Sequence, residues 1–437
     1  MSPLGLLVSS LYLLCCVASS FGDGVPAIAP FFGTKGRYEE ASPRPATDVP
    51  AADAPSPACR ALHLTAVVRH GTRYPSAASA RKMRRVYSLA QAAGGNRDVV
   101  SGALGYSEDM DGRLAEKGRG DHGDLAVRLA RSFPSLLTER NLRAGRVRFV
   151  SSSKHRCVDS TVAFRRGLER LWGVGEDEKI GYEVNDALMR FFDHCPRFVE
   201  RVEKNASALL EVELFKAGLE MNATRTKLAD RLKVPYVNFT ADMVEAAFYL
   251  CSYDFTIHGH ISPWCHLFDE ADAQVMEYAG DLKQYWKRGY GHDINRQSSC
   301  ILFHDLFSRL DRADNESSYG EVSEAVTVQV GHAETLLPLL TLMGLFKDDE
   351  ALDSTNFATQ GNRTFRSGRM VPYAANLVMV LYDCPEGRRL QAHLNEKPLT
   401  LPRFQELSPL YEEVKRTYKH LLQGCNPESV CQLPAKQ

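Results

Sequence analysis

Three stretches of the chain share the order of apolar strand, polar turn and amphipathic helix. The run from Leu62 to Val68 is apolar and β-branched, as in a buried strand, and a helical pattern extends from Pro75 to about Ala93. The order recurs with a strand at 147–151 before a helix at 154–171, and a strand at 325–330 before an apolar helix to about 345. Such units build a mostly parallel sheet with helices on both faces. We therefore predict an α/β fold in which the three polar turns share one edge of the sheet.

The remaining segments predict a helical insertion and a closing segment. Residues 181–299 carry few strand patterns and several helical ones, among them 206–219 and 269–285. We interpret this region as a mainly helical cap inserted into an α/β catalytic domain formed by 59–180 and 300–437. Strands at 376–382 and 390–394 and a helix at 402–423 are expected to complete that domain.

The two ends of the chain differ from the rest in composition. Residues 1–22 resemble a signal peptide, because an apolar run from Leu4 to Val17 ends in small residues. That run of about 14 residues is shorter than the roughly 20 that cross a bilayer, so we expect no membrane span in the mature chain. Residues 23–58 are rich in Pro, Ala, Ser and Asp and predict a flexible arm. The chain ends at 434–437 without a KDEL-like signal, so we expect the endoplasmic reticulum lumen or secretion.

The overall composition is that of a globular protein, and it restricts the partners. Hydrophobic residues make up 44% and charged residues 24%, which excludes a disordered or collagen-like chain. Lys and Arg number 53 against 54 Asp and Glu, so the chain lacks the basic excess of a general nucleic-acid binder. A polyanionic small molecule would therefore be bound by a local cluster of basic residues.

Sequons and cysteines agree with entry into the secretory pathway. The five Asn-x-Ser/Thr sequons are Asn205, Asn222, Asn238, Asn315 and Asn362. Of the 11 cysteines, Cys15 and Cys16 lie in the leader, so at least one of the others is unpaired. An oxidising compartment allows the rest to form disulfides.

The cysteine positions favour disulfides over a metal site. The disulfide candidates are Cys251 with Cys265 and Cys425 with Cys431, each close in sequence, together with Cys59 and Cys384. Cys157 is the expected unpaired thiol. The alternative is a zinc site formed by His258, His260, Cys265 and His266. Because the chain has no CxxC pair, we predict a disulfide loop and no metal.

The three predicted turns carry residues that suit phosphoryl chemistry. They supply Arg69, His70 and Arg73 from the first turn, Arg156 from the second, and His332 and Glu334 from the third. Ligands of open α/β sheets bind beyond the carboxyl ends of the strands, where these turns meet. Three arginines present forks of donors that fit an oxyanion with several acceptor oxygens. Since surrounding cations disfavour an imidazolium, His70 is expected to be neutral and nucleophilic.

Hydrolysis of a phosphate monoester needs more than one catalytic device. The acceleration required reaches ~10²¹, whereas general acid and base catalysis supplies about 10² to 10⁴. Covalent catalysis by His70, charge stabilisation by the arginines and protonation of the leaving oxygen by Glu334 divide the task. Glu334 must be protonated when it acts, so we expect activity to fall as the pH rises through its pKa in the complex.

These residues stand in motifs that resemble the histidine acid phosphatase family. The stretch from Arg69 to Pro75 reads RHGTRYP and is similar to the RHGxRxP element of that family. His332 to Glu334 is similar to the HAE form of its second motif. Further stretches resemble one branch, the multiple inositol polyphosphate phosphatases, namely SSKHRC at 152–157, SPWC at 262–265, 331–344, FRSG at 365–368 and VPY at 371–373. The resemblance extends from about Cys59 to Cys431.

The resemblance implies a site and an activity. His70 would form a transient phosphohistidine, and Glu334 would protonate the leaving group. The residues expected to bind the phosphoryl group are Arg69, Arg73, Arg156 and His332. The family needs no metal and no other cofactor. The branch acts on phytate and lower inositol polyphosphates, with the 3-phosphate of 2,3-bisphosphoglycerate as a further substrate.

Each of these assignments has an alternative. Arg156 is also interpretable as a surface residue at a helix end, and Glu334 as a carboxylate that complements a helix dipole. Among functions, the alternatives are a broad-specificity secreted acid phosphatase and a non-catalytic glycoprotein that binds anions. The binding protein would lack a catalytic residue, whereas both His70 and an acidic donor are present.

A second group of basic residues lies near the motifs. Ser76 and Ala77 stand where the resemblance leads us to expect a basic residue that holds the polyphosphate. Arg81 and Lys82 follow one to two turns later and could compensate, the alternative being a solvated helix face. The further candidates for substrate contact are Lys154 and His155.

Overall fold

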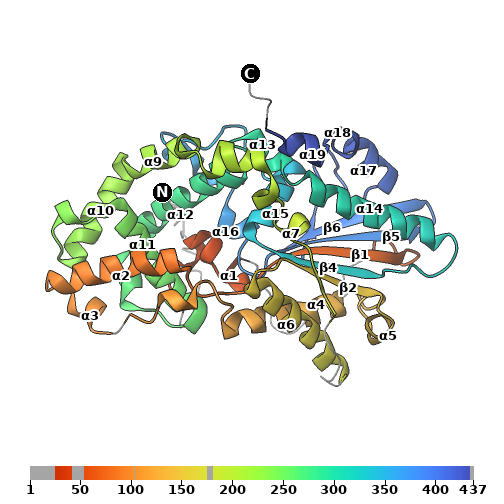
Figure 1. Ribbon diagram of the computed structural model, residues 1–437, viewed down its shortest axis with the longest axis horizontal. Helices are drawn as coiled ribbons and strands as arrows, with labels where there is room; N and C mark the ends of the chain where they lie inside the picture. The colour runs from red at the N-terminus through yellow and green to blue at the C-terminus, as the bar shows by residue number, and fades with distance from the viewer. Residues whose placement is uncertain (1–24, 42–53, 103, 175–180, 434–437) are drawn as a thin grey trace, which may run out of the picture.

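The computed structural model describes residues 25–41, 54–102, 104–174 and 181–433, and its strands form one sheet (Figure 1). The order of the strands is β3-β2-β4-β1-β5-β6-β7. Their bounds are β1 Arg60–Arg69, β2 Val147–Ser151, β3 Glu183–Val184, β4 Val326–Gly331, β5 Asn376–Cys384, β6 Gly387–Leu394 and β7 Lys397–Leu399. β1, β2 and β4 are the three strands that the sequence pattern predicts to precede polar turns.

The sheet has a parallel half and an antiparallel half. β1 pairs parallel with β4, and β2 pairs parallel with both β4 and β3. β5, β6 and β7 continue the sheet from β1 through antiparallel pairings. In the parallel half Arg69 lies opposite Gly331, and Ser151 lies opposite Val330. The three strands therefore end side by side, and the residues that follow them share one edge.

A helix follows each of these three strands, as predicted. The helices are α2 Ala77–Ala92, α6 His155–Trp172 and α15 Ala333–Leu342. Ser76 caps α2, because its side chain accepts a hydrogen bond from the Ser79 amide. The other helices of this part of the chain are α3 Arg97–Val100, α4 Glu116–Ser132, α5 Glu139–Arg143, α14 Cys300–Ser317, α16 Ser367–Met370, α17 Tyr411–Thr417, α18 Lys419–Gly424 and α19 Pro427–Cys431. α4, α5 and α6 lie below the sheet in the view of Figure 1, and α14 lies above it.

The chain from α7 to α13 is helical, and α9 to α12 lie to one side of the sheet (Figure 1). Its helices are α7 Asp186–Met189, α8 Pro196–Phe198, α9 Leu210–Lys216, α10 Leu219–Leu232, α11 Ala241–Tyr253, α12 Glu270–Arg288 and α13 Asp293–Gln297. α2 packs against α11, so this region is joined to the helix that follows β1. The cap boundaries at 181 and 299 stay a prediction, but the helical character of the region is observed.

Two predicted helices begin or end elsewhere. The predicted helix at 206–219 is a short 3-10 turn followed by α9. The helical conformation is interrupted before Gly218, and α10 begins after it. The expected helix at 402–423 starts only at Tyr411. Residues 402–408 form turns and bends, and Leu410 forms an isolated β-bridge with Arg389 of β6. Tertiary pairing overrides the helical pattern there.

The prediction of a flexible arm is wrong for residues 25–41. This segment forms the 3-10 turns η1 Ala29–Phe31 and η2 Gly33–Lys35 and the helix α1 Tyr38–Ala41. Phe32 is buried, with its ring centroid 5.4 Å from that of Phe248 in α11 and 6.2 Å from that of Phe255. The apolar side chains are too few for a period, yet they suffice to anchor the segment by burial. The predicted signal peptide at 1–22, the residues 42–53 of the arm and the C-terminal residues 434–437 lie outside the described residues.

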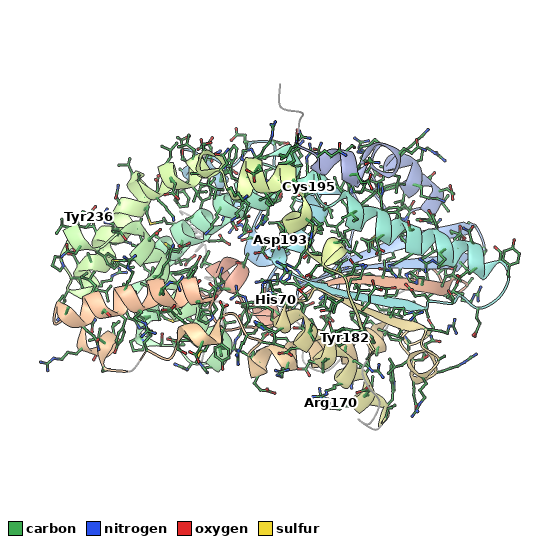
Figure 2. The ribbon with its side chains drawn as sticks, in the orientation of Figure 1. His70, Arg170, Tyr182, Asp193, Cys195 and Tyr236 are labelled. Atoms are coloured by element: carbon green, nitrogen blue, oxygen red, sulfur yellow. A yellow bond between two sulfur atoms is a disulfide. The ribbon has the colours of Figure 1, made fainter. Side chains whose placement is uncertain are left out.

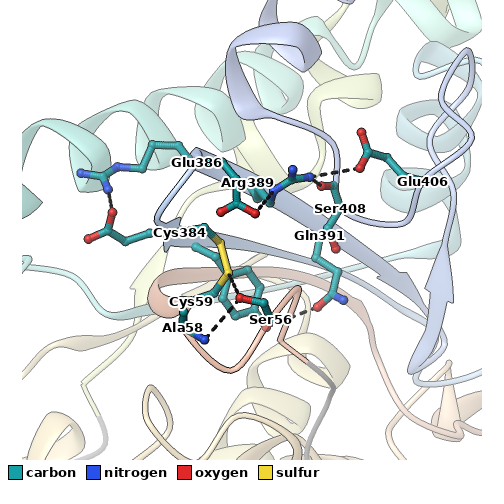
Figure 3. The surroundings of a disulfide bond; sticks show 12 residues. Ser56, Ala58, Cys59, Cys384, Glu386, Arg389, Gln391, Glu406 and Ser408 are labelled. Carbon is teal, nitrogen blue, oxygen red and sulfur yellow. Dashed lines mark hydrogen bonds and ion pairs between the residues drawn. A yellow bond between two sulfur atoms is a disulfide. The ribbon is translucent and has the colours of Figure 1, made fainter.

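Four disulfides join distant parts of the described chain. Cys59 at the start of β1 is bonded to Cys384 at the end of β5, as Figure 3 shows. Cys251 and Cys265 are bonded as predicted, and Cys157 is free and buried, also as predicted. The predicted local pair of Cys425 and Cys431 is wrong. Their partners are Cys300 and Cys195, respectively.

The corrected pairings follow from helix packing. α19 packs against α8, which brings Cys431 to Cys195. The disulfide of Cys265 leaves no thiolate for the alternative zinc site with His258 and His260. The described residues contain no group of three or more His, Cys, Asp or Glu side chains placed to hold a metal ion. Each helix in the described part of the chain is too short or too polar to span a bilayer.

Candidate active site

The loop after β1 is held in place by its close approach to α4 and α6. A Cβ atom on Gly71 would lie 2.3 Å from the carbonyl oxygen of Gly118 in α4, so this position requires glycine. The amide of Gly71 donates to Ser160 Oγ of α6 at 3.1 Å. Thr72 donates to Asp121 Oδ2 of α4 through its amide at 3.0 Å and its hydroxyl at 2.7 Å. Two helices therefore fix the backbone that carries Arg69, His70 and Arg73.

His70 is a buried, neutral imidazole, with 2% of its surface exposed. Its Nδ1 lies 2.9 Å from the carbonyl oxygen of Gly71, which only accepts, so Nδ1 carries the proton. Nε2 therefore keeps the lone pair that a nucleophile needs. Burial, followed by the positive charges of Arg156 and Arg69, holds the pKa of His70 well below its usual range. In Figure 2 His70 lies between the sheet and the helical region.

Three arginines from two of the turns surround this imidazole. Arg69 Nη1 donates to the carbonyl oxygens of Thr34 at 2.8 Å and Val371 at 2.6 Å. Arg73 Nη1 donates to the carbonyl oxygen of Tyr74 at 2.8 Å. Burial lowers the pKa of Arg69 to about 10, which leaves it charged at neutral pH. We call Arg69, His70, Arg73, Arg156 and His332 the phosphoryl cluster.

Each arginine of the phosphoryl cluster keeps an unused donor. The Nε atoms of Arg69, Arg73 and Arg156 are buried and have no hydrogen-bond partner among the described residues. None of the three guanidinium groups forms an ion pair with a described carboxylate. Buried donors without partners are rare in proteins and costly to leave unpaired. An oxyanion with several acceptor oxygens would satisfy them, which fits a phosphoryl group.

His332 links the third turn to the second. Its Nδ1 accepts a hydrogen bond from Arg156 Nη2 at 3.1 Å, so Nε2 carries the proton and donates to Ser152 Oγ at 3.0 Å. The ring centroids of His332 and His70 are 5.6 Å apart. Burial and the charge of Arg156 lower the pKa of His332 to about 3. The structure thus brings together all the residues that the sequence predicts for phosphoryl binding.

Glu334 lies in the first turn of α15, two residues beyond His332. Burial raises the pKa of its carboxyl group, but nearby positive charge, chiefly that of Arg288, outweighs this effect and holds the pKa well below its usual range. The free protein therefore holds Glu334 as a carboxylate. A proton donor must be protonated, and the negative charge of a bound phosphate ester would offset these cations. This position in the first turn of α15 also agrees with the alternative interpretation, in which Glu334 is a carboxylate that complements the helix dipole.

The other basic candidates lie outside the phosphoryl cluster. Arg81 Nη1 donates to Glu108 at 2.7 Å, and Lys82 Nζ to Asp242 at 3.2 Å. These cations of α2 are already paired, so they do not replace the basic residue expected at Ser76. Two further candidates at the start of α6 are exposed, Lys154 and His155. Of the sequons Asn222 is half-buried, and the exposed ones are Asn205, Asn238, Asn315 and Asn362.

Several residues that support the site are absent from the sequence prediction. His122 Nε2 lies 3.0 Å from the carbonyl oxygen of Arg69, and the guanidinium of Arg69 stacks on the ring of Tyr373 at 4.4 Å. Tyr253 OH lies 3.4 Å from Arg73 Nη1. Tyr373 belongs to the VPY stretch at 371–373, so this motif could have identified it as a residue of the site. His122 and Tyr253 lie on helices without a motif, so only the fold reveals them.

Comparison with known proteins places this geometry in a family. The family model of the histidine phosphatase superfamily (branch 2) matches residues 62–396. A Gallus gallus protein named multiple inositol polyphosphate phosphatase 1 is 48% identical over 441 residues, which cover 97% of this chain and 96% of that protein. The Homo sapiens protein of the same name is 46% identical over 458 residues, which cover 98% of this chain and 93% of that protein.

Solved structures share the fold at low sequence identity. The phytase from D. castellii has a TM-score of 0.75 at 17% identity, covering 92% of this chain and 87% of its own. The Bifidobacterium longum multiple inositol polyphosphate phosphatase, solved in complex with inositol hexasulfate, has a TM-score of 0.74 at 16% identity. That match covers 91% of this chain and 98% of the other. The architecture is therefore shared well beyond recognisable sequence similarity.

Proposed function

Because the chain belongs to branch 2 of the histidine phosphatase superfamily, we propose that its phosphoryl cluster hydrolyses inositol polyphosphates such as phytate. The Gallus gallus and Homo sapiens relatives are named for this activity. The observation that carries the proposal is the neutral imidazole of His70 among three arginines whose Nε donors are buried and unpaired among the described residues. The enzyme is a phosphoric monoester hydrolase, and its substrate is a small polyanion.

The first chemical step forms a covalent intermediate on His70. Its Nε2 attacks phosphorus, the P–N bond forms, and the bond from phosphorus to the ester oxygen breaks. Glu334, protonated in the complex, gives its proton to the departing oxygen, so the product leaves as an alcohol. The arginines stabilise the charge that spreads over the equatorial oxygens of the phosphoryl group.

The second step returns the protein to its starting state. Water attacks the phosphorus of the phosphohistidine, the P–N bond breaks, and inorganic phosphate is formed. The carboxylate of Glu334 accepts the proton of that water, which restores the acid for the next turnover. The low pKa of Glu334 in the free protein means that this group is a carboxylate there and has room for the proton. No step of this scheme passes through a metal ion.

Substrate class and domain roles follow as parts of the same proposal. Several phosphates on one ring match a site rich in cations, and 2,3-bisphosphoglycerate is a smaller polyanion of the same chemical class. We assign the helical residues 181–299 as a cap beside the catalytic domain. A broad-specificity acid phosphatase would show no preference for polyphosphates. A non-catalytic anion binder is disfavoured because His70 and Glu334 are both present.

The cellular compartment is also part of the proposal. We place the chain in the secretory pathway, either in the lumen of the endoplasmic reticulum or outside the cell. Four disulfides within the described residues and four exposed sequon asparagines support this placement. Mass spectrometry of the protein from secreting cells is expected to find glycans on these asparagines.

Phosphate release by purified protein tests the proposal. The wild type is expected to release phosphate from phytate with and without a chelator, and from p-nitrophenyl phosphate. His70→Ala removes the nucleophile, so release from phytate is expected to fall by at least about 10⁴, toward the level that binding and charge stabilisation alone supply. Turnover of the His70→Ala variant at the wild-type rate would contradict the mechanism.

A further inference from the structure

The N-terminal segment that precedes β1 forms one wall of a pocket next to the phosphoryl cluster. The carbonyl oxygen of Thr34 accepts a hydrogen bond from Arg69 Nη1 at 2.8 Å, so η2 is joined directly to a catalytic arginine. Thr256 Oγ1 donates to the carbonyl oxygen of Lys35 at 2.9 Å, which fixes the other end of η2. The backbone on both sides of the Lys35 side chain is therefore held in place.

Lys35 lines a pocket between η2, α11 and α12. The other lining residues that matter here are Glu245 and Tyr249 of α11 and Lys283 of α12. The ammonium of Lys35 lies 4.9 Å from the ring centroid of Tyr249 and donates to Thr34 Oγ1 at 3.0 Å. Tyr249 lies one helical turn from Tyr253, whose hydroxyl contacts Arg73. The rings of Tyr249 and Tyr253, whose centroids are 6.4 Å apart, therefore connect Lys35 to Arg73 of the phosphoryl cluster.

The ammonium of Lys35 forms no ion pair with a carboxylate of the described residues. The pocket contains two carboxylates, and both already have partners. Glu245 accepts from Tyr249 OH at 2.8 Å and pairs with Lys82 at 3.6 Å. Glu277 pairs with Arg363 at 2.9 Å and with Arg366 at 2.7 Å. Lys216, at the same pocket, is paired with Asp242 at 2.8 Å. Lys35 therefore differs from Lys82 and Lys216, because no carboxylate of the described residues forms an ion pair with it.

The surroundings of Lys35 disfavour its charge unless an anion is present. Burial and the positive charges of Arg73 and Arg69 lower its pKa to about 7. A partly buried ammonium beside two guanidinium groups is costly in the free protein. An anionic group that enters the pocket would reduce this cost and gain a charge-assisted hydrogen bond.

We propose that Lys35 is a specificity-determining residue that binds a second phosphate of the substrate while the first phosphate lies against His70. This inference rests on the proposed function, since it needs a substrate with more than one phosphate. The Arg69 to Thr34 hydrogen bond sets the position of Lys35 relative to the reacting phosphoryl group. A monophosphate such as p-nitrophenyl phosphate places no group in the pocket, so Lys35 adds nothing to its binding.

Steady-state kinetics on two substrates test the inference. Lys35→Met keeps the length of the side chain and removes its charge. It is expected to lower kcat/KM for inositol hexakisphosphate by about 10- to 100-fold, mainly through KM, because one charge-assisted hydrogen bond is lost. The value for p-nitrophenyl phosphate is expected to change by less than about twofold, which also shows that the variant folds. Lys35→Arg keeps the charge and is expected to restore most of the loss.

A matched lysine provides the control. Lys227 of α10 is ion-paired with Asp269 at 3.0 Å and Asp272 at 2.6 Å and lies outside the pocket. Lys227→Met is therefore expected to leave kcat/KM unchanged for both substrates. Equal losses on both substrates in Lys35→Met would mean that the residue only supports Arg69, and this would overturn the inference. An unchanged kcat/KM for inositol hexakisphosphate would overturn it as well. A wild type that releases no phosphate from any ester would instead contradict the proposed function itself, and this inference with it.

Discussion

Two groups of basic side chains, the arginines of the phosphoryl cluster and the cations of α2, differ in what neutralises them. In the phosphoryl cluster Arg69, Arg73 and Arg156 are largely buried and have no carboxylate partner among the described residues, and each keeps an unpaired Nε. On α2, Arg81 and Lys82 are partly exposed, with 57% and 42% of their side chains accessible, and both are ion-paired. The two groups together carry five positive charges, but only the three of the phosphoryl cluster lack a carboxylate partner among the described residues.

This difference shows that an anion site is marked by cations that lack a carboxylate partner, and not by the number of cations in a segment. An exposed ion pair contributes about 0 to 1 kcal/mol and leaves little charge for a ligand. A buried guanidinium that keeps a free donor contributes more to binding, because the ligand also removes the cost of the unpaired group. Variants that neutralise one member of each group therefore provide the sharpest test of this contrast.

The largest difference is expected between Arg156→Met and Arg81→Met. Arg156 binds the phosphoryl group in the mechanism and orients His332, so its loss is expected to lower kcat/KM by about 10² to 10³ on both phytate and p-nitrophenyl phosphate. Arg81 is paired with Glu108, and its loss is expected to change either value by less than about twofold. Steady-state phosphate release measures both variants. A larger loss from Arg81→Met would reverse the assignment of the two groups.

A smaller and more selective effect is expected from Glu334→Gln. The amide cannot protonate the leaving oxygen, so kcat for inositol hexakisphosphate is expected to fall by about 10², within the range of general acid catalysis. p-Nitrophenolate leaves without protonation, and its kcat is expected to fall by less than about tenfold. The ratio of the two losses separates proton donation from the phosphoryl binding that Arg156 provides. Equal losses would assign the donor to another residue.

The smallest effect is a shift in the pH profile of Arg288→Gln. Arg288 of α12 is the main positive charge that lowers the pKa of Glu334, so its removal raises that pKa. Glu334 must be protonated to act, and a higher pKa keeps it protonated to a higher pH. The descending limb of kcat for inositol hexakisphosphate is therefore expected to move to higher pH, by on the order of one unit.

Lys287 provides the control for that shift. It lies next to Arg288 on the same helix and pairs with the same carboxylate, Glu203, at 2.8 Å, but it is not among the main causes of the low pKa of Glu334. Lys287→Met is expected to leave the pH profile unchanged. A shift toward lower pH in Arg288→Gln, or an equal shift in both variants, would contradict the assigned role of Glu334.

The parallel half of the sheet and its site were predictable because local signals specify them. Each of β1, β2 and β4 has an apolar run, a polar turn and a helix, and the parallel pairing of such strands fixes where the turns meet. The RHGTRYP and HAE motifs then identify His70 and Glu334. Pattern and motif agree at each of these positions.

The parts that the sequence missed depend on contacts between distant residues. Residues 29–41 have the composition of an arm, and contacts with distant residues, such as those of Phe32 with Phe248 and Phe255, hold them beside the site. Cys425 and Cys431 are close in sequence, but helix packing directs each to a different partner. The pairing of Arg81 with Glu108 is likewise invisible in the sequence, because 27 positions separate them.

Direct detection of the covalent intermediate tests the central claim that His70 accepts the phosphoryl group. Wild-type protein mixed with inositol hexakisphosphate and quenched within milliseconds in alkaline detergent, which preserves the P–N bond, is analysed by peptide mass spectrometry. The account predicts a phosphoryl group on the peptide that contains His70, and none on that peptide from His70→Ala. Phosphate release by the wild type without this adduct, or the same adduct on another residue, would contradict it.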